Sequence, residues 1–118
     1  MSQLFVAQIV LPKLGNNGES LESAHAYIRK SLCKHFGGFT ALDSFGGWID
    51  PDSGVEYLEA GITYQTGMAD TAENAELLRV IAIEAGIMAQ QLAMAVTLPN
   101  RAFEILTIAQ EESRNAEA

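Results

Sequence analysis

The chain has 118 residues, of which 48% are hydrophobic and 19% charged, a composition that excludes a disordered protein and fits one folded domain. The net charge of −8, with only seven lysine and arginine residues, leads us to expect neither a nucleic acid nor an anionic membrane surface as a partner. The single cysteine, Cys33, excludes an internal disulfide and a cysteine-held zinc site, and we expect no cofactor and no metal.

Residues 3–11 predict a strand that is apolar on both faces, which is typical of a central strand covered on both sides. One face carries Phe5, Ala7, Ile9 and Leu11, and the other carries Leu4, Val6, Gln8 and Val10. No basic segment precedes this apolar run, which is too short to span a membrane. We therefore expect no secretory signal and a cytoplasmic location.

A first helix is predicted from about residue 21 to 36, after a loop rich in glycine and asparagine. Ser20 is the expected N-cap, and Gly37 is expected to end the helix in a left-handed conformation. The apolar stripe of this helix consists of Leu21, Ala24, Ile28 and Leu32. The segment FGGFTALDSFGGW holds two glycine pairs, and the first pair is thereby explained as a helix end.

Two strands are predicted at residues 39–49 and 55–66, joined by the turn DPDSG. In this turn Pro51 presets φ and Gly54 permits a positive φ. In the second strand, one face carries Leu58, Ala60, Ile62 and Tyr64, and the other carries Tyr57, Glu59, Gly61 and Thr63.

Folding the hairpin about this turn places Trp48 near Tyr57 and one glycine of the second pair, Gly46 or Gly47, near Glu59. Adjacent glycines inside a strand indicate a bulge or a close backbone approach. We therefore expect a bulge or a positive φ at this pair, and free space beside the carboxylate.

A second helix is predicted to open at Asp70, with Glu73 completing a capping-box-like pair, and to run to about Met88, with Gly86 weakening its end. Its inward residues are expected to be Leu77, Val80, Ile81, Ala85 and Met88. A strand over residues 90–99 follows, and then a short strand or helical turn over residues 101–106.

The predicted order is β-α-β-β-α-β, which indicates an α+β, ferredoxin-like fold. We expect a four-stranded antiparallel sheet with two helices on one face, and an extra short C-terminal strand or helix is left open. Residues 1–108 would form the domain, and residues 109–118 a polar, frayed tail.

Four segments, LCKHFGGFT, GGW, VEYLEAGI and AQQLAMAV, make residues 28–96 resemble small uncharacterised ferredoxin-like proteins of bacteria, phages and plasmids. In that group a helix ends in Phe-Gly-Gly, a hydrophobic residue and Thr, a Gly-Trp follows, and the next strand carries a glutamate. Its last strand often opens with glutamine, which would be Gln91 here. The resemblance implies the fold and no established activity.

Glu59 is the candidate catalytic residue, because a carboxylate in an apolar strand beside Trp48 and Tyr57 would have its pKa raised by desolvation. The alternative is a structural carboxylate that is exposed or hydrogen-bonded to Tyr57 or to backbone amides. His25 and His35 are about 15 Å apart along one helix, which is too far for a shared metal. We interpret His25 as a boundary histidine packed beside the core, His35 as a helix-end residue and Cys33 as structural or idle.

The acidic residues around the hairpin, Asp43, Asp50, Asp52 and Glu56, lack the spacing of a calcium loop and indicate a turn. The segment LGNNG likewise lacks the pattern of a phosphate loop. The uncovered sheet face, with Leu4, Val6, Val10, Trp48 and Tyr57, is too apolar to face water, so a second copy or a small apolar ligand should cover it.

Three functions stay open at this point. The first is a homodimeric binding module that holds a small apolar ligand at the sheet face, with Trp48, Tyr57, Gly46, Gly47 and Gln8 as ligand or dimer residues. The second is a small enzyme of the dimeric α+β barrel kind that uses Glu59 for proton transfer. The third is an acidic decoy, which the charge allows although its acids are scattered among apolar strands.

Overall fold

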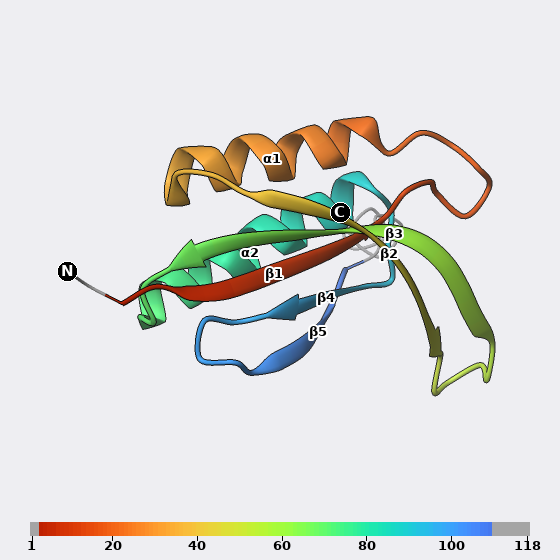
Figure 1. Ribbon diagram of the computed structural model, residues 1–118. Helices are drawn as coiled ribbons and strands as arrows, with labels where there is room; N and C mark the ends of the chain where they lie inside the picture. The colour runs from red at the N-terminus through yellow and green to blue at the C-terminus, as the bar shows by residue number, and fades with distance from the viewer. Residues whose placement is uncertain (1–2, 110–118) are drawn as a thin grey trace, which may run out of the picture.

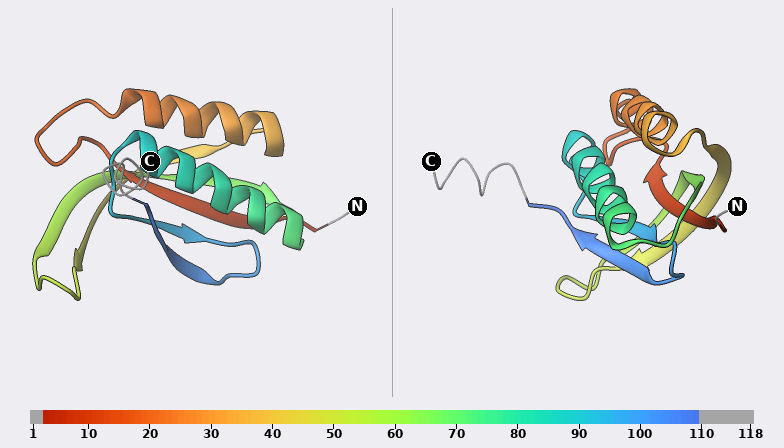
Figure 2. Two further views of the ribbon diagram at one scale, coloured as in Figure 1. Left: turned by 180° about the vertical axis from the view of Figure 1, so that it is seen from behind. Right: turned by 90° about the vertical axis from the view of Figure 1, so that its left-hand side faces the viewer.

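The computed structural model describes residues 3–109, and within them a five-stranded antiparallel sheet carries two helices on one face (Figures 1 and 2). The elements in chain order are β1 (Phe5–Pro12), α1 (Glu22–Phe36), β2 (Thr40–Ile49), β3 (Glu56–Met68), α2 (Ala72–Met88), β4 (Ala93–Thr97) and β5 (Phe103–Thr107). The strand order across the sheet is β2-β3-β1-β4-β5. Neither helix is long and apolar enough to cross a membrane.

The α+β class, the antiparallel sheet and the two helices on one face are confirmed, but the expected count of four strands is wrong. The fifth strand, β5, pairs antiparallel with β4, so the segment that could have been a helical turn is a strand. The Arg79 guanidinium on α2 donates to both carboxylate oxygens of Glu104 on β5, at 2.8 and 3.1 Å, which fixes this strand to the helical layer. The predicted tail spans residues 109–118, and residues 110–118 of it lie outside the described residues, so the domain boundary stays a prediction.

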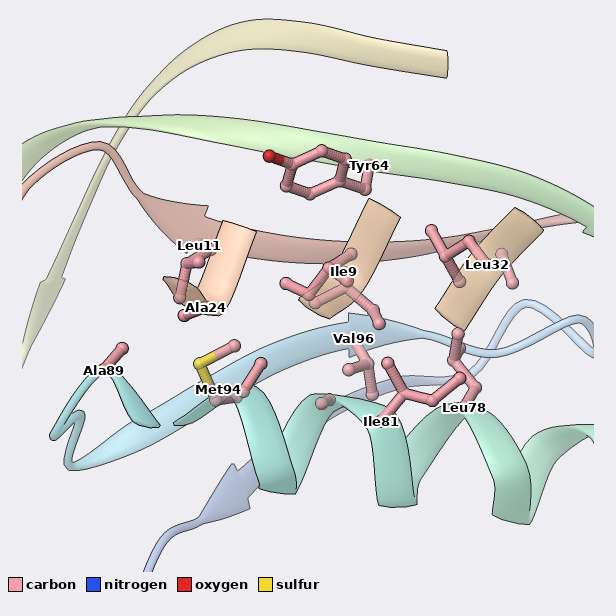
Figure 3. Close-up of a cluster of buried hydrophobic side chains, with 14 of the residues drawn as sticks. Ile9, Leu11, Ala24, Leu32, Tyr64, Leu78, Ile81, Ala89, Met94 and Val96 are labelled. Atoms are coloured by element: carbon pink, nitrogen blue, oxygen red, sulfur yellow. The ribbon is translucent and has the colours of Figure 1, made fainter. Parts of the chain in front are cut away.

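The core lies between the helices and one face of the sheet, as Figure 3 shows. Strand β1 is central, as expected, and its side chains Ala7, Ile9 and Leu11 are fully buried under the helices. The predicted stripe of α1 is buried as well. On the opposite face of β1, Leu4 and Val6 are 63% and 59% exposed, so within residues 3–109 this strand is covered on one side and not on both.

Both helix starts differ from the prediction by about one residue. Helix α1 begins at Glu22 with Leu21 at the N-cap position, and the Ser20 hydroxyl accepts from the backbone N–H of Glu22 at 3.2 Å. The cap of α2 is Thr71, not Asp70, because the Thr71 hydroxyl accepts from the backbone N–H of residue 74 at 3.1 Å. Gly37 ends α1 with a φ of 92°, which confirms its left-handed conformation.

The inward face of α2 also differs from the prediction. Val80 and Met88 are exposed, whereas the buried residues are Leu78, Ile81, Ala82, Ala85 and Gly86. Gly86 lies so close to β4 that an added Cβ would be 2.7 Å from Cγ of Met94. This glycine therefore permits close packing of the helix on the sheet and is not simply a weak helix end.

The distal half of the β2–β3 hairpin extends past the helices and bends away from them (Figure 1). Side chains there that share the helix-facing side of the sheet have no helix above them, so Phe45 and Leu58 are 74% and 63% exposed. The bend curls the hairpin toward the sheet face opposite the helices, which we call the open face. The candidate site lies on this face.

Candidate functional site

The hairpin register confirms the predicted neighbours. Backbone pairing is continuous from Thr40 opposite Gln65 to Ile49 opposite Glu56, which puts Gly46 opposite Glu59. The same register puts Trp48 opposite Tyr57, and their rings stack with centroids 5.0 Å apart and planes inclined by 16°. These four residues point to the open face, because side chains of paired residues lie on the same side of a sheet. The turn residue Gly54 has the predicted positive φ, at 74°.

The expected bulge or positive φ at Gly46 and Gly47 is wrong. The pairing runs through both residues without a bulge, and neither has a positive φ. The two glycines are explained instead by the space that surrounds their backbone. A Cβ added at Gly46 would meet nothing within 4 Å, whereas one at Gly47 would lie 2.5 Å from Cδ2 of Leu58. Gly46 therefore leaves a free volume on the open face directly across from Glu59.

A groove of about 710 Å³ occupies this part of the open face. Register places five small residues under it, which are Ser44, Gly46, Gly61, Ala93 and Ala95. The large side chains Trp48 and Tyr57 border it on the hairpin, and Phe103 and Ile105 border it on β5. Small residues in the middle of a sheet face, flanked by large ones, produce a hollow of the size that small-molecule ligands occupy.

Glu59 is a half-buried carboxylate in this groove. Among residues 3–109 its side chain has no hydrogen-bond or ion-pair partner, so the expected alternative of a carboxylate bonded to Tyr57 or to glycine amides is not what the structure shows. Burial raises the pKa of Glu59 above its ordinary value. An unpartnered carboxylate of this kind can accept or donate a proton, or serve as the counter-ion of a bound cation.

Gln8, another predicted site residue, lies on the open face outside the groove lining. Its side-chain oxygen accepts from Nε2 of Gln65 at 2.7 Å, and its amide contacts the Thr97 hydroxyl at 3.5 Å. These bonds form a polar row across β3, β1 and β4. Gln91, suggested by the family resemblance, does line the groove, next to Leu92.

Several lining residues escaped the sequence analysis. Asn16 reaches the groove from the loop after β1, and Thr63 lies in it with its hydroxyl 3.1 Å from that of Ser44. Phe103 and Ile105 were missed because the type of their segment was undecided. The available signal was the two-residue spacing of Phe103 and Ile105 in FEILT, which places both on one face of a strand.

His25 is more deeply placed than a boundary position, with only 6% of its surface exposed. Its Nε2 lies 2.8 Å from the carbonyl oxygen of Pro12, and its Nδ1 lies 2.6 Å from the hydroxyl of Tyr64. A carbonyl can only accept, so Nε2 donates to Pro12, and in the neutral ring Nδ1 accepts from the Tyr64 hydroxyl. Burial raises the pKa of the Tyr64 hydroxyl. Because His25 also contacts the carbonyl oxygen of Pro12, it holds the end of β1, where Pro12 lines the groove.

The remaining candidates lie outside the groove lining. His35 and Cys33 are exposed near the end of α1, and within residues 3–109 no cluster of three or more histidine, cysteine or acidic side chains is placed to hold a metal ion. In the hairpin turn, the carboxylate of Asp50 accepts from the backbone N–H of Asp52 at 2.9 Å. This bond gives the Asp50 side chain a role in the turn.

Two solved structures are similar to this chain. A phage SAM lyase in complex with S-methyl-5′-thioadenosine matches with a TM-score of 0.68 at 13% identity, over 91% of this chain and 92% of that one. A phage SAM lyase in its apo state matches with a TM-score of 0.60 at 10% identity, over 91% of this chain and 84% of that one. At these identities the likeness establishes the fold. No family model and no curated protein matches the chain.

Proposed function

We propose that this protein is an enzyme that binds an adenosine sulfonium compound, S-adenosylmethionine, in the groove and cleaves it to S-methyl-5′-thioadenosine. The single observation that carries the proposal is the half-buried Glu59 carboxylate, which has no partner within residues 3–109 and lies in a groove of ligand size. The fold is one on which an enzyme named a SAM lyase is built, and that enzyme has been captured with a thioadenosine ligand. This likeness favours the enzyme hypothesis over the binding module.

The groove offers a role for each part of such a substrate. The stacked rings of Trp48 and Tyr57 provide an aromatic surface on which a purine base can stack. Asn16 and the hydroxyl pair of Ser44 and Thr63 supply polar atoms for the ribose or the amino acid part. The raised pKa of Glu59 suits a group that must take up a proton near neutral pH.

In the proposed step, the Glu59 carboxylate removes a proton from the carbon adjacent to the one bonded to sulfur. The C–H electron pair forms a C=C bond, and the C–S bonding pair leaves with the sulfur. The sulfonium becomes the neutral thioether S-methyl-5′-thioadenosine, the other fragment becomes an unsaturated amino acid, and the proton remains on Glu59 until it passes to water. Atoms and charge balance without any further reactant.

The test is to incubate the full chain with S-adenosylmethionine and to identify both products by mass spectrometry. We expect S-methyl-5′-thioadenosine and an unsaturated four-carbon amino acid. Glu59→Gln should lower the rate at least about 100-fold, as loss of a general base does. Glu56→Gln is the matched control, because Glu56 lies on the same strand with its side chain on the opposite sheet face.

Absence of turnover in the wild-type protein would contradict the proposal. Cleavage that yields a four-carbon product without a C=C bond would contradict the role of Glu59 as base and leave the cleavage itself standing.

We also propose that the protein is a homodimer in which a second copy covers the open face. The supporting observation is the row of exposed apolar side chains there, above all Leu4, Val6 and Phe103. Burying such a row against a second copy removes apolar surface from water at both sites at once. Light scattering at micromolar concentration should give twice the chain mass, and a mass near 12.7 kDa would contradict the dimer.

A further inference from the structure

The described lining of the groove carries an acidic residue and no basic one. Glu59 is the one acidic side chain among the lining residues described, and none of these residues is a lysine, an arginine or a histidine. Lys13 lines a neighbouring hollow of about 670 Å³ together with Glu59. Its Nζ is bound to the carboxylate of Asp43 at 3.0 Å. The groove therefore holds a negative charge that no basic lining residue neutralises.

We propose that the groove selects its nucleoside by charge, with Glu59 as the specificity-determining residue. A sulfonium should bind more tightly than the thioether of the same shape, and a 5′-phosphate should bind more weakly than either. This inference rests on the proposed function, whose substrate it defines more closely: the ligand is cationic at the atom that replaces the 5′-oxygen.

The physical basis is the cost of an unpartnered carboxylate. A half-buried Glu59 has lost part of its hydration without gaining a partner in residues 3–109, which is why its ionised form is disfavoured. A cation in the groove supplies that partner. A neutral thioether leaves the carboxylate unpaired, and a phosphate places like charges together.

Charge attraction in the groove also affects turnover. Cleavage converts the cationic sulfonium into a neutral thioether, so the product loses the charge attraction that held the substrate. The groove thus favours substrate over product although both carry the same adenosine. Loss of this attraction favours release of the thioether.

The experiment compares three ligands that share adenosine and differ at the 5′ position. These are 5′-dimethylsulfonio-5′-deoxyadenosine, S-methyl-5′-thioadenosine and adenosine 5′-monophosphate, which carry a positive, a neutral and a negative group. Binding to the full chain is followed by calorimetry and by the fluorescence of Trp48, the single tryptophan of the chain. We expect the sulfonium to bind about tenfold more tightly than the thioether, as for one partly buried charge pair, and the phosphate to bind most weakly.

The same series is then measured with Glu59→Gln and Glu56→Gln. Gln keeps the shape of the side chain and removes its charge, so Glu59→Gln should bind sulfonium and thioether within about twofold of each other. Glu56→Gln removes the same charge from the other side of the strand and should keep the tenfold preference. Circular dichroism verifies that each variant is folded.

The outcomes separate the two proposals. Equal affinity of the wild-type protein for all three ligands would overturn charge selection and leave nucleoside binding intact. A preference that survives in Glu59→Gln would overturn the role of Glu59. Failure of the wild-type protein to bind any of the three would contradict the proposed function itself, and charge selection with it.

Discussion

Replacing Gly46 by valine should stabilise the protein and abolish ligand binding. Gly46 has no positive φ, and a Cβ built there meets nothing within 4 Å, so a side chain can be added without strain. That side chain would stand in the groove directly across from Glu59. Stability and binding should therefore change in opposite directions.

The expected gain in stability follows from the restricted backbone of the unfolded chain. A glycine replaced where the new residue fits restricts the unfolded chain and gains about 0.4–1 kcal/mol, and valine is a favoured strand residue. We expect a gain in the free energy of unfolding of about 0.5–1 kcal/mol, or a rise in the thermal midpoint of a few degrees. The affinity for S-methyl-5′-thioadenosine should fall more than about tenfold, because the valine methyl groups occupy ligand volume.

Thermal unfolding and calorimetry on the same samples test this, with Gly67→Val as the control. Gly67, on β3, lies on the same face of the sheet as Gly46 but outside the groove. A Cβ added there would make an ordinary contact of 3.8 Å with Leu4. The control should be stabilised similarly and should bind normally. A loss of about 1–3 kcal/mol in Gly46→Val, or unchanged affinity, would refute the view that Gly46 is there to leave space.

Two further predictions concern buried polar groups. Because the folded-state pKa of Glu59 is raised, the protonated carboxyl favours folding at low pH and this contribution is lost as the pH rises through that pKa. Glu59→Gln should therefore have a higher thermal midpoint than the wild type at pH 7, with the difference shrinking toward pH 4, and an equal or lower midpoint at pH 7 would contradict this. His25→Phe should cost about 1–3 kcal/mol for each of the two partners it leaves unpaired, Pro12 and Tyr64. In urea unfolding, Tyr64→Phe should cost less than His25→Phe, because it leaves one partner unpaired and not two, and the reverse order would contradict this reasoning.

The sequence was sufficient wherever local rules determine the structure. Turn chemistry at Gly54 and strand alternation together set the hairpin register, so the pairing of Trp48 with Tyr57 could be predicted within one residue. The left-handed end of α1 at Gly37 could be predicted in the same way, because glycine has no Cβ and adopts a positive φ without steric cost. These features depend on neighbours in the chain and not on distant contacts.

The sequence-based predictions were wrong where several arrangements of the same residues satisfy the local rules. Helix α2 is apolar on much of its circumference, so a stripe through Val80 and Met88 fits its period as well as one through Leu78 and Ala82. The choice is made by tertiary packing, since Gly86 must face Met94 of β4. In the same way, a glycine pair in a strand is compatible with a bulge and with a regular strand that leaves space for a ligand. Only the pairing with the opposing strand shows which of the two occurs.

The groove itself follows from the unequal lengths of the elements. The 15 residues of α1 and the 17 of α2 give helices of about 22 and 25 Å, whereas the 13 residues of β3 extend to about 43 Å. A strand that overshoots its helical layer by about 20 Å must leave its end uncovered. Twist then turns that end away from the helices, toward the open face where Glu59 lies. The carboxylate is half-buried where its own hairpin curls over the sheet, so the fold obtains a sheltered acidic group without a third layer of structure.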